Sequence, residues 1–155
     1  MRCNAWPVLT PLLFVATLQA QGTVSPSGVP WMAGPSILPA GALLAVASGD
    51  PTRPGPSVIQ IFMPDGYRMP PHLHPADEHA QVLTGALLIG IGRKLDPRKT
   101  MKLVPGDSGT APTGAPHYTI AIGPTVLQVS FEGPYTITYV NAYEAPRSPA
   151  FPSLP

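Results

Sequence analysis

Cysteine is almost absent from this chain of 155 residues, which contains only Cys3. A lone cysteine cannot form an intramolecular disulfide, so covalent cross-links within the chain are excluded as a source of stability. Hydrophobic residues make up 44% of the composition, which argues against a disordered chain. The length suffices for one domain with its own hydrophobic core, and is too short for two comfortable ones.

Charge is also scarce, because charged residues make up 11% of the chain and the formal net charge is +1. Nucleic-acid binding needs several cations on one face to neutralise phosphates, and the sequence has no basic stripe. We therefore expect no nucleic-acid partner. The only basic concentration consists of Arg93, Lys94, Arg98, Lys99 and Lys102. A solvated hairpin loop is the favoured interpretation, with an anion site as the alternative.

The sequence has no apolar run long enough to span a membrane, which takes about 20 residues. The run LLFVATL at 12–18 follows Arg2 and precedes LQA at 18–20. This pattern predicts a secretory signal over residues 1–20, cleaved after Ala20. An uncleaved amphipathic anchor is the alternative. We expect a periplasmic or secreted protein with no stable membrane insertion once the signal is removed.

Amphipathic helical windows are missing too, and the chain has 23 prolines and 15 glycines. An interior proline costs a helix about 3 kcal/mol, whereas short strands joined by turns tolerate it. The Pro/Gly-rich segment 21–40 is expected to form an extended arm, and 145–155 a proline-rich tail. The ordered domain is expected over residues 41–144.

Short β-type runs fill that domain, with turn signals between them. The predicted strands cover 42–48, 57–63, 80–92, 99–104, 117–122, 125–133 and 135–141. Within 80–92, Thr84-Gly85 predicts a tight hairpin turn between two strands. Many short strands at this spacing are typical of a sandwich or barrel, so the fold class is predicted to be all-β.

Three of the four histidines fall in the decapeptide PPHLHPADEH at 70–79. Strand residues i and i+2 share a face, so His72 and His74 would project side by side, about 7 Å apart. Glu78 starts the next strand and can reach the same ion. Two imidazoles and a carboxylate suit iron and its neighbours in the first transition row. His117, the remaining histidine, follows the rigid turn APTGAP and is the predicted fourth ligand.

Two motifs carry a resemblance to the cupin superfamily. The first has the spacing Gly66-x5-His72-x-His74-x3-Glu78-x6-Gly85, and the second has Gly106-x5-Pro112-x-Gly114-x2-His117. The second motif departs from the family at Ala121, where an asparagine is common. The motifs span residues 66–121, and the flanking strands extend the resemblance to about 40–144.

The resemblance implies an antiparallel jelly-roll (double-stranded β-helix) barrel with one divalent transition metal ion in its mouth. His72, His74, Glu78 and His117 would be the metal ligands. Iron or manganese is expected on family grounds, while zinc, nickel and copper also accept such ligands. A small-molecule ligand or substrate and a homodimer are the expected partners.

Four protein ligands leave open positions on a six-coordinate ion, as catalysis requires. Glu78 would either remain a ligand or act as a base. Arg68 would share the face of His72 and His74 in a regular strand and hold a carboxylate or enolate. If the prolines break the register, Arg68 would be a surface residue. Met69, Val82, Tyr118 and Phe131 are predicted to line the substrate pocket, with plain core positions as the alternative.

Three functions fit these residues. The first is an exported metalloenzyme that oxidises or cleaves a small organic molecule with dioxygen, an assignment that follows from likeness of fold. The second is a non-catalytic cupin that binds a small molecule or metal as a sensor or carrier. The third is oxygen-independent isomerase, lyase or hydrolase chemistry at the same ion.

Overall fold

The computed structural model describes residues 29–146. The predicted signal segment 1–20, the first part of the predicted arm and almost all of the tail lie outside the described residues. Between residues 29 and 146, no helix is long and apolar enough to cross a membrane.

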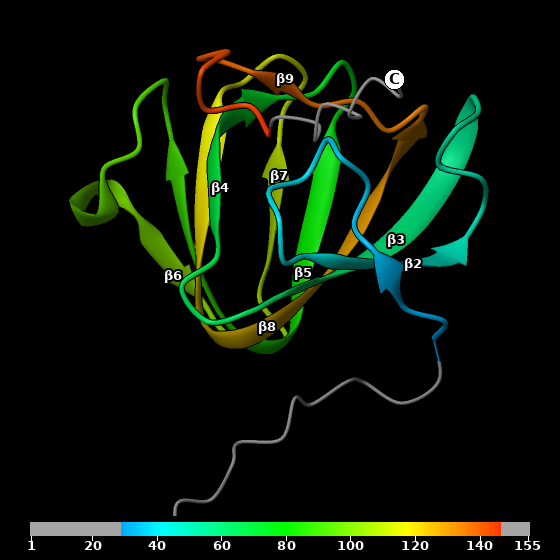
Figure 1. Ribbon diagram of the computed structural model, residues 1–155, viewed down its shortest axis with the longest axis horizontal. Helices are drawn as coiled ribbons and strands as arrows, with labels where there is room; N and C mark the ends of the chain where they lie inside the picture. The colour runs from blue at the N-terminus through cyan, green and yellow to red at the C-terminus, as the bar shows by residue number, and fades with distance from the viewer. Residues whose placement is uncertain (1–28, 147–155) are drawn as a thin grey trace, which may run out of the picture.

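Strands account for nearly all the regular structure of the described part (Figure 1). In chain order the elements are β1 (Met32–Ala33), β2 (Leu43–Ser48), β3 (Gly55–Met63), β4 (Arg68–Leu73), β5 (Glu78–Ile91), the 3-10 turn η1 (Pro97–Lys99), β6 (Met101–Leu103), β7 (Ser108–Ala111), β8 (His117–Gly133) and β9 (Thr138–Tyr139).

The long strand β8 organises the sheet. Its second half pairs with β3 and its first half with β4, while β5 pairs with it along almost its whole length. β2 and β1 extend the sheet beyond β3, and β6 and β7 pair with β5. All pairings are antiparallel, and the sheet curls into a half-barrel with β9 across its open side (Figure 1). The all-β class and the cupin-type jelly roll are thereby confirmed.

Alternation along the strands places the core inside this curl. In β3, every second residue is buried, from Ser57 through Ile59 and Ile61 to Met63. Side chains of a strand point to opposite faces in turn, so these four share the inner face. They pack against inner residues of β8 such as Leu127 and Val129. Burial of this apolar surface is the main force that holds the sheet in its curled form.

The predicted hairpin at Thr84-Gly85 is wrong. β5 runs unbroken from Glu78 to Ile91, and β8 is likewise one strand where two were predicted. Gly85 has φ +77° as a turn would require, but it lies at register shifts between β5 and β8. An added Cβ at Gly85 would overlap the backbone of Pro124. Both strands therefore bend together at a bulge. A bulge favours glycine for the same reason as a hairpin turn, because glycine adopts a positive φ without strain.

The described part of the arm packs onto the sheet. β1 pairs with β2, and Leu38 is buried in the core. Two tyrosine hydroxyls fasten the segment that contains Leu38. Tyr67 donates to the carbonyl of Pro39 at 2.8 Å, and Tyr139 donates to that of Ile37 at 2.7 Å. Residues 37–39 thus form a fixed cover over one end of the half-barrel.

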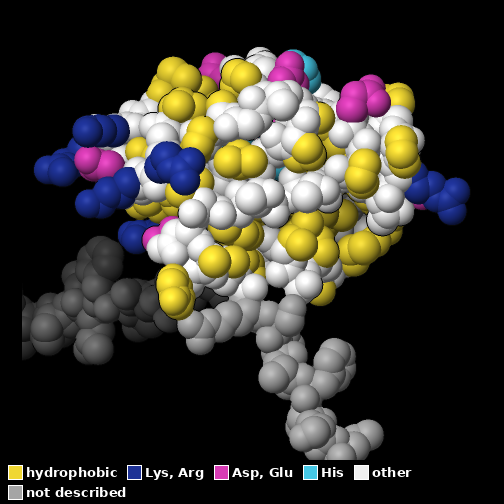
Figure 2. Space-filling model, turned by 90° about the horizontal axis from the view of Figure 1, so that it is seen from above, with side chains coloured by type: hydrophobic (Ala, Val, Ile, Leu, Met, Phe, Trp, Pro, Cys, Tyr) yellow, Lys and Arg dark blue, Asp and Glu magenta, His cyan; other side chains and the backbone are white. Residues whose placement is uncertain are grey.

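The cations of the segment between β5 and β6 are all exposed, as expected for a solvated loop. Figure 2 shows these Lys and Arg side chains grouped at one end of the molecule. The loop is anchored from within, because the buried Tyr118 donates its hydroxyl to the carbonyls of Asp96 and Lys99.

Candidate metal centre

Four buried polar residues converge inside the half-barrel from the ends of three strands. His72 lies in β4 and His74 just after it, while Glu78 begins β5 and His117 begins β8. His72 and His117 are directly paired across β4 and β8. The pairing of the strands therefore brings together residues that are far apart in the sequence.

The three imidazoles form one compact cluster. One ring nitrogen from each of His72, His74 and His117 lies within 4.8 Å of the other two. The ring centroids are 4.3 Å apart for His72 and His117, 5.0 Å for His72 and His74, and 5.3 Å for His74 and His117. This spacing allows all three rings to reach one metal ion.

Backbone carbonyls set the tautomer of each ring. The Nδ1 atom of His72 lies 2.7 Å from the carbonyl oxygen of Pro70. That of His74 lies 2.8 Å from the oxygen of Thr136, and that of His117 lies 3.1 Å from the oxygen of Ala115. A carbonyl only accepts, so each Nδ1 carries the proton and each neutral ring keeps a lone pair on Nε2. Histidines that bind a metal ion through one ring nitrogen typically donate the N–H of the other nitrogen in this way.

Glu78 lies against two of these Nε2 atoms. Its Oε2 is 3.0 Å from Nε2 of His74, and its Oε1 is 4.0 Å from Nε2 of His117. The His74 contact does not have the alignment of a hydrogen bond, so Nε2 of this buried ring has no hydrogen-bond partner. A metal ion bound to both atoms would satisfy this contact, as does a proton on Nε2 in the metal-free protein. Glu78 is placed to share an ion with the histidines, and its role as a ligand stays a prediction.

The charges of the site follow from burial and from this contact. Burial lowers the pKa of His72 to about 3 and also lowers the pKa of His117, so both rings are neutral near pH 7. Burial lowers the pKa of His74 too, but the Glu78 carboxylate outweighs it and the net pKa is raised. Burial raises the pKa of Glu78, but the adjacent His74 outweighs it and the net pKa is lowered. The carboxylate is therefore ionised.

A small cavity of about 40 Å³ adjoins the cluster. His72, His117 and Glu78 form its polar wall. The remaining lining is mostly apolar and consists of Leu38, Ile61, Met63, Tyr67, Met69, Thr119, Leu127, Val129 and Tyr135. By the usual measure of about 10–15 Å³ for one water, the cavity holds about three waters. No Lys or Arg lines it.

The structure separates the other predicted site residues. Met69 lines the cavity, whereas Arg68 is exposed and does not. The register of β4 against β8 shifts between Met69 and His72, so the regular strand that would place Arg68 beside the histidines does not form. Val82 lies in the core without lining the cavity.

The two predicted aromatic residues of β8 also have different positions. Phe131 lies beside the metal cavity rather than in it, with its ring centroid 4.7 Å from that of Tyr135. Tyr118 directs its hydroxyl to the loop before β6, and the cavity is lined by its neighbours His117 and Thr119 instead. Adjacent residues of a strand face opposite sides of the sheet. The Tyr118 side chain therefore lies on the outer face of the sheet.

Tyr135 belongs to the site and was not among the predicted residues. Its hydroxyl donates to Oε2 of Glu78 at 3.2 Å, and its ring stacks on His74 at 5.4 Å between centroids. Burial and the nearby carboxylate raise its pKa well above 10, so it is a hydrogen-bond donor. The residue follows β8, where the sequence predicted another strand. No spacing rule connects it to Glu78, 57 positions earlier.

The residues present fit a divalent transition metal. Three imidazoles whose Nδ1 atoms are bonded to backbone carbonyls, together with one ionised carboxylate, make a donor set that such ions accept once His74 has given up its Nε2 proton. The unpartnered Nε2 of His74 is the buried polar atom that an ion would satisfy. The donor set does not decide which metal binds, because iron, manganese, zinc, nickel and copper all use these ligands.

Comparisons with known proteins agree with this geometry. Residues 58–131 match the cupin domain. KdgF from a Halomonas species is 20% identical over 69% of this chain and 89% of its own, with a TM-score of 0.55. An oxalate oxidase in complex with the substrate analogue glycolate is 26% identical over 70% of this chain and 60% of its own, with a TM-score of 0.51.

A third structural relative is the DMSP lyase DddQ from Ruegeria pomeroyi DSS-3. It is 21% identical over 78% of this chain and 64% of its own, with a TM-score of 0.57. The search of curated proteins found no significant match. The matched segment contains all four of these residues, His72, His74, Glu78 and His117. Residues 58–131 therefore form a cupin domain, and the structure has neighbours among small cupins.

Proposed function

We propose that this protein is an exported cupin that binds one transition metal ion and oxidises or cleaves a small organic molecule with dioxygen. The observation that carries the proposal is the convergence of three Nε2 lone pairs beside an ionised Glu78, next to a cavity. A structural metal site is closed by its protein ligands, whereas here a space adjoins the ligand atoms. The oxalate oxidase likeness supports the oxidase assignment.

His72, His74, His117 and Glu78 would hold the ion. When bound, the ion would act as a Lewis acid and as the site of redox chemistry. The protein orients the imidazoles through the carbonyls of Pro70, Thr136 and Ala115. Tyr135 holds one oxygen of Glu78, which opposes release of this carboxylate to act as a base. We therefore assign Glu78 to the ligand role.

The cavity limits the substrate to a small and largely apolar molecule. Its volume of about 40 Å³ takes only a few non-hydrogen atoms beyond the ion. With Arg68 exposed and no other cation in the lining, only the ion would be present to neutralise a negative substrate group. A divalent ion with the Glu78 carboxylate leaves one net positive charge. A molecule of a few non-hydrogen atoms with one weakly acidic or carbonyl oxygen, such as the enol of a small ketone, fits this balance.

The test begins with metal analysis of protein purified from its own compartment, followed by oxygen uptake with small carbonyl and phenolic compounds. We expect uptake that is lost in His74→Gln and retained in His79→Gln, since His79 is exposed and contacts Thr110 instead. Turnover that persists without oxygen would replace this proposal with lyase, isomerase or hydrolase chemistry. Tight binding without turnover would indicate a sensor or carrier.

Export and assembly are parts of the proposal that need their own measurements. The N-terminal segment 1–20 supports export, and mass spectrometry of protein from the periplasm or medium should find a chain that begins at Gln21. We also propose a homodimer, in which the exposed edge of the sheet pairs with a second copy. Light scattering would give its mass, and a monomer would refute this part.

A further inference from the structure

We infer that the open groove beside the metal cavity is the route by which small ligands reach it, that Tyr135 separates the two spaces, and that the route favours neutral or cationic molecules over anions. The inference rests on the proposed function, because it takes the histidine cavity as the place where a ligand binds. It adds an entrance, a residue that controls the entrance, and a charge preference.

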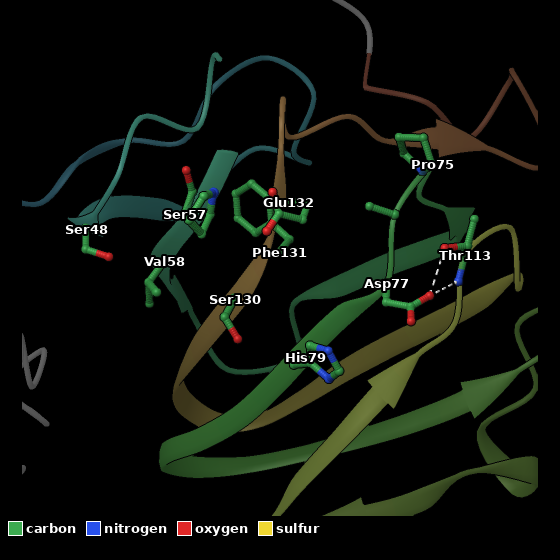
Figure 3. Close-up of a pocket in the computed structure, with 12 residues that line it drawn as sticks. Ser48, Ser57, Val58, Pro75, Asp77, His79, Thr113, Ser130, Phe131 and Glu132 are labelled. Carbon is green, nitrogen blue, oxygen red and sulfur yellow. Dashed lines mark hydrogen bonds between the residues drawn. The ribbon is translucent and has the colours of Figure 1, made fainter. Parts of the chain in front are cut away.

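The groove lies on the side of the half-barrel (Figure 3). Its volume is about 760 Å³, which is far larger than the 40 Å³ of the metal cavity. The loop that carries Pro75 and Asp77 forms one wall, and Ser57 and Val58 of β3 form the opposite one. Phe131 lies between these walls, toward the core. The groove is open to solvent and large enough to accept a small organic molecule.

A small space, called the neck below, shares lining residues with both the groove and the metal cavity. The volume of the neck is about 10 Å³, which is about the space of one water. Phe131 and Glu132 line both the groove and the neck. Glu78 and Tyr135 line both the neck and the metal cavity. The shared residues are the basis for placing the neck between the groove and the histidines.

Tyr135 and Glu78 close the inner end of this neck. The hydrogen bond between them spans 3.2 Å and lies where the neck meets the cavity, since both residues line both spaces. The ring of Tyr135 also packs on His74 and Phe131. Opening requires the rotation of one side chain, with loss of one hydrogen bond and of the ring contacts with His74 and Phe131, but no displacement of the backbone.

The cover formed by residues 37–39 is closed more firmly. Leu38 lines the cavity there and is 5% exposed. The hydroxyls of Tyr67 and Tyr139 hold the backbone on either side of it, at Pro39 and Ile37. Opening at this end requires displacement of a backbone segment and loss of two hydrogen bonds together with a core contact. The side route is therefore the easier one.

The charges along the side route are negative. Asp77 and Glu132 line the groove, and Glu132 also lines the neck, while neither space has a Lys or Arg in its lining. Asp77 accepts hydrogen bonds from the backbone and hydroxyl of Thr113 at 2.7 and 2.8 Å, which stabilise its ionised form. Two carboxylates at an entrance slow the approach of anions and do not hinder neutral molecules.

Histidine modification of the metal-free, full-length protein tests the route. Diethyl pyrocarbonate acylates unprotonated imidazoles and is larger than the neck, so its rate at the three buried histidines reports how often the cavity opens. Mass spectrometry of peptides follows His117 separately from the others, and the exposed His79 serves as the internal fast reference. We expect Tyr135→Ala to accelerate modification of His117 by about tenfold, with a smaller increase in Tyr135→Phe.

Leu38→Ala and Tyr139→Phe are the matched controls, because they weaken the cover formed by residues 37–39. We expect His117 modification in both to stay within about twofold of the wild type. The route is refuted if these controls accelerate the reaction and Tyr135→Phe and Tyr135→Ala do not. It is also refuted if all four variants accelerate it equally, because that would indicate general loosening. A melting curve of each variant shows whether it is still folded. If Tyr135→Ala is unfolded, the His117 modification rate of Tyr135→Phe decides whether the route exists.

The charge preference has a separate test in protein loaded with Co²⁺, whose absorption reports ligand binding. Stopped-flow rates are measured for azide as the anion and pyridine as the neutral probe. We expect Glu132→Lys to speed azide binding about threefold and to leave pyridine binding unchanged. Equal effects on both probes, or none on azide, would refute the preference. If the wild type takes up no Co²⁺ or other divalent metal, the proposed function fails, while the histidine modification still decides the route.

Discussion

Metal loading should raise the stability of this protein, and loss of one histidine ligand should abolish most of the gain. An ion that binds only the folded state stabilises it by about 2.7 kcal/mol when its concentration is 100 times Kd. For the 118 residues between 29 and 146, that corresponds to a rise in Tm of about 10 °C. The gain arises because the unfolded chain does not hold the three Nε2 atoms within 4.8 Å.

The perturbation is His74→Gln, which removes the ring whose Nε2 has no hydrogen-bond partner. If the substitution weakens binding about 100-fold, the same ion concentration equals the new Kd and the gain falls to about 0.4 kcal/mol. The expected rise in Tm is then only about 2 °C. For each variant, the Tm of the chelated sample is subtracted from that of the loaded sample. This difference does not include the effect of the substitution on the stability of the metal-free fold.

The assay is differential scanning calorimetry of wild type, His74→Gln and His79→Gln, each stripped with chelator and then loaded in turn with iron, manganese, zinc, nickel and copper. His79 is the matched control, because it is exposed and its ring bonds to Thr110 outside the cluster. We expect His79→Gln to show the same metal-dependent rise in Tm as the wild type. The reasoning is refuted if no ion raises the Tm of the wild type, or if His74→Gln keeps the whole rise.

Three substitutions away from the site test the packing of the sheet. Gly90→Ala should destabilise the fold by about 1–3 kcal/mol, because its new Cβ would overlap the ring of Tyr118; urea unfolding measures this, and a neutral result would contradict the packing. Thr125→Val should cost about 1–3 kcal/mol in the same assay, because a buried hydroxyl that bonds both the N–H and the carbonyl of Ala86 is lost. Tyr118→Phe should cost about 0.5–1.5 kcal/mol and speed amide exchange in the loop before β6; unchanged exchange would show that its bond to the Asp96 carbonyl does not anchor the loop.

The sequence predicted the fold class and the cluster of histidines because both depend on local patterns. Alternating apolar residues and frequent prolines leave few options other than short strands, and His72 and His74 are close by the period of a strand alone. Joining His117 to them relied on the resemblance to the cupin motifs. The structure brings these three side chains together as that resemblance implied.

Two of the positions that local patterns misjudged lie where strands change register. Gly85 indicates a positive φ equally well in a hairpin turn and in a bulge, and only the pairing of β5 with β8 distinguishes them. A register shift beside the two prolines of β4 likewise decides that Met69, rather than Arg68, lines the cavity. A slip of one residue exchanges the two faces of a strand, so small irregularities decide which side chains belong to the site.

By itself, the sequence determined that the chain forms strands and that His72 and His74 project together from one of them, since backbone geometry imposes the period of side chains along a strand. Only the tertiary structure decided that Tyr135 bonds to Glu78 and stacks on His74, and that these three residues line one small space. The physical reason is that these contacts join segments about 60 residues apart. Their distance depends on how the whole sheet curls, and no local rule of propensity or spacing contains that information.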